Sequence, residues 1–231
     1  MIHSEVSLLD NVAWHSLCGE HALFSSGGSS ARRYGAGFSP IIAFANIANP
    51  DFSDLEQVCG SGEFFFSDGW NGEAPEGWKI ERKLDMYKMV WAGGPAPEVI
   101  TSGLDIRQLS TADIPAVLDI TSRLKPGPFG PRTIELGTYL GLFDGDKLAS
   151  MAGERFVAGP FREISGVCTD NDYQGRGYAR LLMNLLVIKQ LERGEIPFLH
   201  AVTANTVAVE LYTRMGFEIY KTSPLQISRK R

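Results

Sequence analysis

The sequence is poor in cysteine, which excludes two kinds of stabilised fold. Only three cysteines occur among 231 residues, Cys18, Cys59 and Cys168, and none forms a C-x-x-C pair. An odd number of widely spaced cysteines supports neither a disulfide framework nor a zinc site. We therefore expect a reducing, cytoplasmic setting and no bound metal.

An excess of basic residues is also lacking. The chain has 22 Lys and Arg against 27 Asp and Glu, giving a formal net charge of −5. Proteins that bind nucleic acid carry a basic patch or stripe, so no nucleic-acid partner is expected. The acidic balance mildly favours a cationic or neutral substrate.

Long apolar runs are missing as well. The densest one, residues 181–188, is interrupted by Asn184 and is far shorter than the roughly 20 residues that cross a bilayer. The first 16 residues show no basic region followed by an apolar stretch, as a secretory signal would. We expect neither a membrane partner nor secretion.

The second half of the chain has a clear pattern of secondary structure. A Gly/Pro-rich break at residues 91–103 precedes an alternating strand at 104–109 and a helix capped by Ser110 or Thr111 with Asp113. Asp144-Gly145 predicts a hairpin turn, and Gly194 closes a helix that starts near Arg176. From residue 104 the predicted order is β-α-α-β-β-β-α-β-α-β-β, ending in one or two strands. This order predicts an α/β fold with a mixed sheet flanked by helices.

Residues 1–98 are less regular and contain no motif with an obvious chemistry. Their apolar spacing predicts helices at 7–24 and 51–59 and strands at 38–45, 62–67 and 78–91. We interpret them as a smaller α/β domain, separate from a main domain at 104–231.

A glycine-rich turn at Gln174–Ala179, "QGRGYA", joins a predicted strand to a predicted helix. Free N–H groups at a helix start bind anions, and Gly175 and Gly177 have no Cβ to hold a phosphate away. Arg176 adds a charged donor. A dinucleotide fingerprint would need glycine at the position of Arg180, and a Walker A loop would need Gly-Lys-Ser/Thr, so both are excluded.

The same turn fits the Q/R-x-x-G-x-G/A signature of the GCN5-related N-acetyltransferase superfamily, which the chain resembles. The resemblance extends over "EISGVCTDNDYQGRGYARLL" and "PFLHAVTANTVAVELYTRMGFEIYK", in the form seen in FR47-like members, and the element order from residue 104 agrees. It implies the family's twisted, mostly antiparallel sheet and acetyl-CoA as the cofactor. FR47-like enzymes of this length often carry an N-terminal domain that resembles a partial acetyltransferase fold.

The resemblance also implies which residues hold acetyl-CoA. Residues 174–179 would cradle the pyrophosphate, and backbone N–H groups at 167–169 would contact the pantetheine arm and the acetyl carbonyl. Asn205, Ala208 and Tyr212 share one helical face by their spacing and suit a groove for the cofactor. The cofactor-binding set is therefore Val167, Cys168, Thr169, Gln174, Gly175, Arg176, Gly177, Tyr178, Ala179, Asn205, Ala208 and Tyr212. Cys168 is interpreted as a small buried side chain, not a nucleophile.

Three groups are candidates for proton transfer. Tyr212 matches the family tyrosine that protonates the departing thiolate. Glu163, eleven residues before Gln174, matches the catalytic glutamate of histone-type members, and alternation places it on one strand face with Val167 unless a bulge intervenes. Glu154 is the second candidate for the base or for binding the substrate ammonium, and water is the third. We favour Glu163 over Glu154.

The predicted function is acetyl-CoA-dependent transfer of an acetyl group to a primary amine of a small molecule or peptide. The alternative is a catalytically silent protein that binds acyl-CoA for regulation. The loop at 125–132, with three prolines, is either part of the acceptor site or a rigid connector. The sequence does not identify the acceptor amine, and it allows a homodimer.

Overall fold

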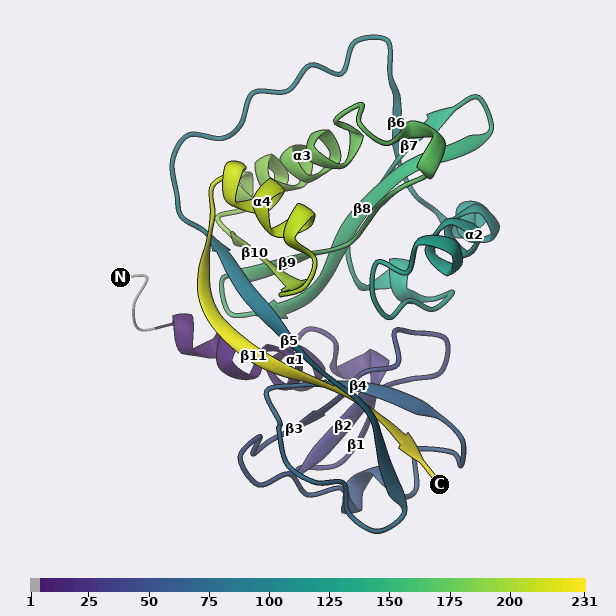
Figure 1. The fold of residues 1–231 in the computed structure, drawn as a ribbon, viewed down its shortest axis with the longest axis vertical. Helices are drawn as coiled ribbons and strands as arrows, with labels where there is room; N and C mark the ends of the chain where they lie inside the picture. The colour runs from purple at the N-terminus through teal and green to yellow at the C-terminus, as the bar shows by residue number, and fades with distance from the viewer. Residues whose placement is uncertain (1–4) are drawn as a thin grey trace.

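The computed structural model describes residues 5–231 and contains a large and a small sheet (Figure 1). Four α-helices and several short 3-10 helices surround them. The α-helices are α1 (Val12–Cys18), α2 (Ile114–Leu124), α3 (Tyr178–Glu192) and α4 (Thr206–Arg214). The 3-10 helices are η2 (Val6–Asn11), η3 (Ala22–Phe24), η4 (Ser53–Leu55), η5 (Thr111–Asp113), η6 (Thr133–Leu136) and η7 (Asn171–Tyr173).

The two sheets do not correspond to the two sides of the break near residue 100, because β4 and β5 precede it and lie in the same sheet as the strands that follow it. The small antiparallel sheet has the order β1-β2-β3, and the large sheet has the order β4-β11-β5-β10-β9-β8-β7-β6. Their bounds are β1 (Ser25–Gly27), β2 (Ala31–Tyr34), β3 (Ile42–Phe44), β4 (Phe64–Asp68), β5 (Trp78–Trp91), β6 (Asp105–Gln108), β7 (Tyr139–Asp144), β8 (Lys147–Ala158), β9 (Phe161–Thr169), β10 (Ile196–Val202) and β11 (Phe217–Lys230).

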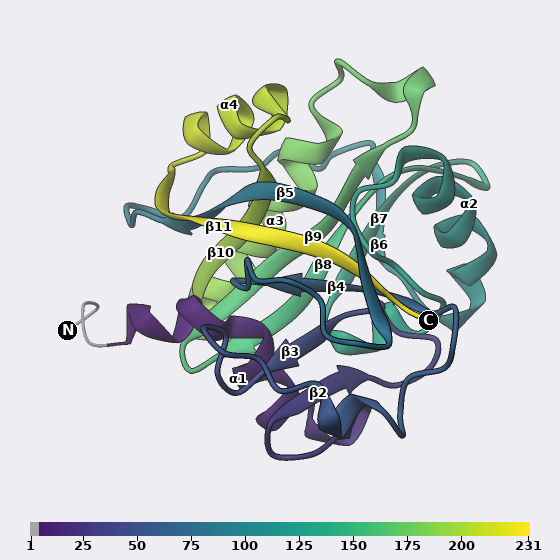
Figure 2. The same cartoon turned by 60° about the horizontal axis from the view of Figure 1, so that its bottom comes forward.

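Strand β5 connects the two halves of the sequence. It pairs with β10 on one side and along nearly its whole length with β11 on the other, both antiparallel. Figure 2 shows β5 and β11 running side by side across the middle of the molecule. Residues 92–104 do form an exposed irregular loop, as the Gly/Pro-rich break predicted. The strands on either side of that loop nevertheless share one sheet, and the division into two domains at 98–104 stays a prediction.

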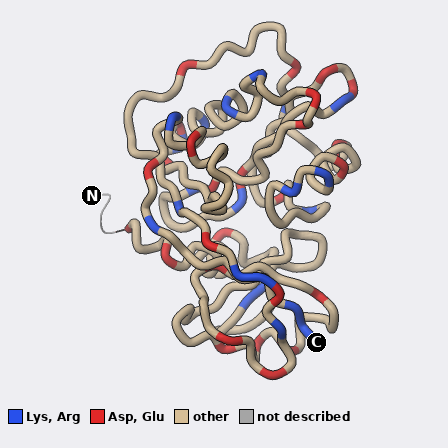
Figure 3. The backbone as a smooth tube through the Cα atoms, viewed as in Figure 1, with Lys and Arg blue, Asp and Glu red and all other residues tan. Residues whose placement is uncertain are grey.

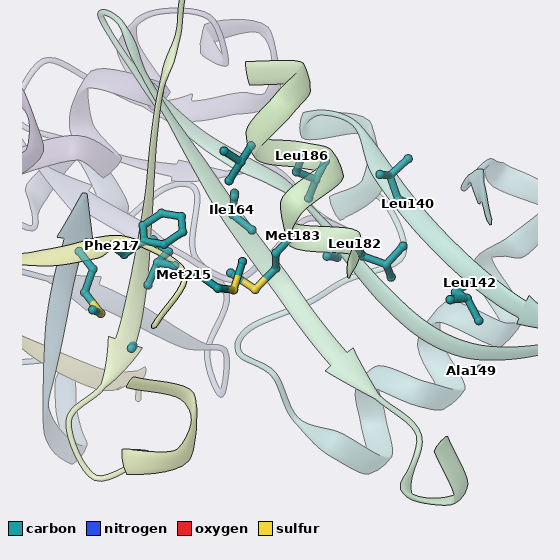
Figure 4. Close-up of a cluster of buried hydrophobic side chains, with 14 residues drawn as sticks. Leu140, Leu142, Ala149, Ile164, Leu182, Met183, Leu186, Met215 and Phe217 are labelled. Carbon is teal, nitrogen blue, oxygen red and sulfur yellow. The ribbon is translucent and has the colours of Figure 1, made fainter. Parts of the chain in front are cut away.

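The helices cover opposite faces of the large sheet. Strand alternation sends Leu140 and Leu142 into one core cluster with α3, and Tyr139 and Phe143 into another with α2. Figure 4 shows Leu182, Met183 and Leu186 of α3 among the buried side chains of the first cluster. Helix α1 covers the second face farther along, where Leu9, Val12 and Leu17 belong to a core cluster that also contains Phe161 and Phe198. The mixed, mostly antiparallel sheet flanked by helices confirms the predicted fold class.

Several local predictions are confirmed and others need correction. Ser110 and Asp113 form a capping box at the start of η5, and Gly194 ends α3 at a φ of 73°. Asp144 still pairs with Lys147, so the turn between β7 and β8 consists of residues 145–146 and not of Asp144-Gly145. Gly145 in this turn has a φ of 58°. The second predicted helix before β7 is only the short η6, and the one or two closing strands are the single strand β11. Strands β1 and β2 were missed, because "SSG" and "ARRY" carry little strand signal.

Candidate active site

The candidate site lies where β9 and β10 separate. The two strands run parallel and pair with each other from Ile196–Phe161 to Leu199–Ile164. Beyond this point β9 continues to Thr169 beside β8, and β10 continues to Val202 beside β5, but the two no longer pair with each other. The register of β9 against β8 shifts between Ser165 and Cys168, and Gly166 there has a φ of 64°. This bulge moves Val167 to the face of Ile164, where both pack against the α3 cluster. The expectation from regular alternation that Glu163 and Val167 share a face is therefore wrong.

A cavity of about 420 Å³ opens at this divergence. Residues of β9 and β10 line it together with the end of α2, the following loop, helix α4 and the N-terminal segment. The lining includes Val167, Cys168, Thr169, Gln174, Asn205, Ala208 and Tyr212, all predicted cofactor contacts. It also includes Ala13, Ile41, Phe66, Asp68 and Met86, which come before residue 98. The N-terminal segment thus forms one wall of the cavity.

The loop before α3 has the features of an anion site. Gly175 and Gly177 have φ angles of 75° and 78°, and nothing lies within 4 Å of a Cβ built on either. Gly177 is the N-cap of the 15-residue helix and supplies no capping side chain, so the first N–H groups of α3 stay available. Arg176 is exposed beside them, stacked over the Tyr173 ring at 4.9 Å. The side chain of Gln174 donates to the Thr169 carbonyl and braces the loop instead. These residues fit a pyrophosphate.

Helix α4 presents a phenol to the cavity. Tyr212 is partly buried, and burial raises the pKa of its hydroxyl to about 12, so the group stays protonated at neutral pH. Asn205 caps the helix by accepting a hydrogen bond from the Ala208 N–H at 3.3 Å. Asn205, Ala208 and Tyr212 line the same cavity, and a protonated phenol there can serve as a proton donor.

Cys168 is not built as a nucleophile. Its side chain is 8% exposed and packs in the cluster with α2. Burial raises the pKa of the thiol to about 12, which removes the thiolate at neutral pH. Cys168 therefore enters the site through its backbone.

Glu163 lies in the cavity wall, but its carboxylate is fully engaged. Both oxygens accept from the Arg155 guanidinium at 2.9 Å, one accepts from the Phe156 N–H, and the other lies 2.7 Å from Nδ1 of His200. Burial alone would raise the pKa of Glu163, but Arg155 and His200 outweigh it and lower the pKa to about 2. A carboxylate this acidic is a poor proton acceptor at neutral pH.

Glu154 lies outside the cavity. Its carboxylate accepts from the Thr138 N–H and from the side chains of Gln190 and Arg193, which places it between β8 and the end of α3. Its side chain is 3% exposed. The structure does not bring Glu154 together with the other candidates.

Glu163 and Arg155 belong to a buried polar cluster that also contains His200, Asp68 and Lys88. The sequence did not assign these last three residues to the site. His200 and Lys88 are direct partners across β10 and β5, and the Asp68 carboxylate forms an ion pair with Lys88. Lys88 is fully buried and also donates to the carbonyls of Leu9 and Asp10. No motif or diagnostic spacing marks His200, Asp68 or Lys88 in the sequence.

The comparisons with known proteins agree with this geometry. The model of the FR47-like protein family matches residues 139–224, which contain the glycine-rich loop and α4. The [ribosomal protein bS18]-alanine N-acetyltransferase of Salmonella typhimurium is 30% identical over 115 residues, covering 47% of this chain and 77% of that protein. The chain belongs to the GCN5-related N-acetyltransferase superfamily. It is an N-acetyltransferase with an FR47-like domain.

Solved structures extend the likeness of this N-acetyltransferase to the whole chain. An acetyltransferase of the GNAT family from Novosphingobium aromaticivorans DSM 12444 has a TM-score of 0.86 at 27% identity, covering 96% of this chain and 98% of that one. A GCN5-related N-acetyltransferase-like protein from Streptococcus suis 89/1591 has a TM-score of 0.54 at 16% identity, covering 90% and 82%, and shares the fold. The first match covers nearly the whole chain and so includes the N-terminal segment that walls the cavity.

The N-acetyltransferase has mixed charges and, among residues 5–231, neither a helix fit to cross a membrane nor a metal-ligating cluster. Figure 3 shows acidic and basic positions interspersed over the fold. Near the end of β11, Arg229 pairs with Glu81 and Lys230 pairs with Glu56. Within residues 5–231, no helix has the length and apolar character needed to cross a membrane. The same residues contain no cluster of three or more metal-ligating side chains.

Proposed function

We propose that the protein transfers an acetyl group from acetyl-CoA to a primary amine of a small molecule or peptide, by direct transfer in a ternary complex. The observation that carries this proposal is the single cavity at the divergence of β9 and β10. It joins a predicted donor side, Val167–Thr169 with Tyr212, to a polar side that contains Glu163 and His200. Family members in general use acetyl-CoA.

The residues present fit the donor. Bound acetyl-CoA would supply the acetyl group in activated form, as a thioester. The Gln174–Ala179 segment would hold its pyrophosphate through the first N–H groups of α3 and through Arg176. The backbone N–H groups of Val167–Thr169, on the part of β9 that no longer pairs with β10, would stabilise negative charge that develops on the carbonyl oxygen. Tyr212 would protonate the sulfur as it leaves.

The proposal is tested by release of free thiol from acetyl-CoA in the presence of a panel of amines, which includes amino acids, polyamines, aminoglycosides and peptides with free N-termini. We expect release that depends on both the protein and one class of amine. Binding of CoA with no release for any amine would support the silent regulatory alternative. The intact Tyr212 and the polar cluster beside the cavity favour the enzyme.

Replacing Tyr212 with phenylalanine should reduce turnover far more than donor binding. The variant keeps the ring that packs on Phe217 and loses only the hydroxyl. Loss of a general acid lowers kcat about 10²-fold or more, while the KM for acetyl-CoA stays near the wild-type value. Steady-state thiol release measures both constants. Tyr220→Phe, whose hydroxyl bonds to Asp10 outside the cavity, is the control, and equal kcat in Tyr212→Phe and wild type would remove Tyr212 from the acid role.

Replacing Gly177 with alanine should weaken acetyl-CoA binding. An alanine at a φ of 78° is strained by about 1–2 kcal/mol and would move the loop or obstruct the phosphate, so we expect the KM for acetyl-CoA to rise about tenfold. The matched control is Gly194→Ala at the opposite end of α3, at a φ of 73° and also with open space around its Cβ. It carries the same strain away from the loop. Equal KM values for the two variants would argue against a phosphate site at Gly177.

A further inference from the structure

One buried polar atom in the cavity has no partner. The side chain of His200 is 8% exposed, and its Nε2 makes no hydrogen bond to any described residue. The ring lines the cavity, and Phe156 and Phe198 hold it edge-on at centroid distances of 6.1 and 5.7 Å. A buried polar atom is normally satisfied, so an orphaned nitrogen fixed at a cavity wall indicates a ligand.

The partner of the other nitrogen determines the tautomer. Nδ1 lies 2.7 Å from Glu163 Oε1, and the Glu163 carboxylate is ionised because it pairs with Arg155 and has a pKa of about 2. An ionised carboxylate can only accept, so Nδ1 must carry a proton. In the neutral ring Nε2 then has a free lone pair directed at the cavity.

Two carboxylates lie near the His200 ring. Glu163 on β9 contacts Nδ1, and Asp68 on β4 has Oδ2 at 3.9 Å from Nε2. Both carboxylates stabilise an imidazolium. Each of them is also paired with a buried cation, Asp68 with Lys88 on β5 and Glu163 with Arg155 on β8.

The position of His200 matches the place where an acceptor must react. His200 follows Leu199, the last residue of β10 that pairs with β9, so it stands at the point where the strands separate. Tyr212, the predicted acid, lines the same cavity from α4. Base and acid thus come from different elements and share one space.

We propose that His200 is the general base of the transfer, with Glu163 as the residue that orients it. This inference rests on the proposed function. The acceptor ammonium gives one proton to Nε2, and its nitrogen then forms the C–N bond to the acetyl carbon while the C–S bond breaks. Tyr212 protonates the leaving sulfur, and the second proton lost by the nitrogen restores the Tyr212 phenol. The first proton leaves His200 for solvent, so one proton is released per turnover.

The main test is the pH dependence of kcat/KM for thiol release with the best amine of the panel. The wild type should lose activity on the acidic side as His200 is protonated. His200→Gln should be about 10²- to 10⁴-fold slower and should lack that acidic limb. His200→Ala should recover part of its turnover when imidazole is added. An acidic limb and a rate unchanged in His200→Gln would overturn the proposal while leaving the acetyltransferase function intact.

A matched control separates catalysis from folding. His21 is also a buried histidine, but both its nitrogens are bonded, to the Tyr34 hydroxyl and the Leu136 carbonyl, and it lies outside the cavity wall. His21→Gln should keep the wild-type pH profile. Glu163→Gln should shift the acidic limb and lower kcat without abolishing it, because it disturbs the orientation of His200. A merely structural Glu163 would change stability and leave the limb in place.

The ring can also be observed without any acceptor. In ¹⁵N NMR of the intact protein, His200 should have a protonated Nδ1 and an unprotonated Nε2 at neutral pH. An Nε2 that stays protonated throughout the assay range would refute the proposal directly. If no amine supports thiol release by the wild type, the proposed function fails, and the tautomer still shows whether His200 is built as a base.

Discussion

Residues 104–231 produced without the preceding segment should not fold cooperatively. Strand β5 lies between β10 and β11, so its removal leaves two unpaired strand edges in the middle of the sheet and uncovers Leu199 and Phe217, which share a core cluster with Met89. It also removes Asp68 and Lys88 from the polar cluster. Circular dichroism during heating should show a broad transition or none, where the full chain gives a sharp one.

Cutting the chain within the preceding loop, without removing any residue, is the control for this truncation. Residues 92–104 form an exposed loop, so residues 1–97 and 98–231 produced together should assemble and regain thiol release. If residues 104–231 alone unfold in one sharp transition, the segment is a separate domain as the sequence suggested, and the shared sheet is dispensable.

Replacing Arg155 with methionine should cost about 3–5 kcal/mol of unfolding free energy. Arg155 and Glu163 are both buried, and removing one partner leaves the carboxylate without its compensating charge. Urea unfolding at neutral pH measures the loss. The double variant Arg155→Met/Glu163→Gln should regain a large part of it, because the uncompensated charge is then gone.

Arg132 provides a close comparison for Arg155. Both guanidinium groups stack over a phenylalanine ring, at 4.4 Å for Arg132 and 4.6 Å for Arg155, and both pair with a glutamate. The Arg132–Glu135 pair is exposed, however, and such pairs contribute about 0–1 kcal/mol. If Arg155→Met loses no more stability than Arg132→Met, burial of the Arg155–Glu163 pair does not control its energy.

The residues proposed for the donor side could be named from the sequence because their signals are local. Gly175, Gly177 and the start of α3 are consecutive in the chain, and Asn205, Ala208 and Tyr212 follow one another at helical spacing. Each group is placed by the element in which it lies. The cavity is lined by Gln174 of the loop, by the end of β9 and by the face of α4, while residues 175–179 lie beyond its lining.

The acid–base side could not be predicted because it depends on contacts between distant strands. Glu163 and Glu154 are both strand carboxylates with arginines nearby, and sequence spacing does not show that one meets His200 while the other meets Gln190 and Arg193. The bulge at Gly166 also moves Val167 to the other face. A single inserted residue has this effect because side chains alternate along a strand.

The sequence by itself determined the family, the mixed sheet and the residues that suit a pyrophosphate, since helix starts, turns and strand patterns are properties of short segments. Only the tertiary structure decided that residues before 98 complete the sheet and wall the cavity, and that Arg155, Glu163, His200, Asp68 and Lys88 form one buried cluster. These five come from five different strands, and their adjacency follows from the strand order and register, which no single segment encodes.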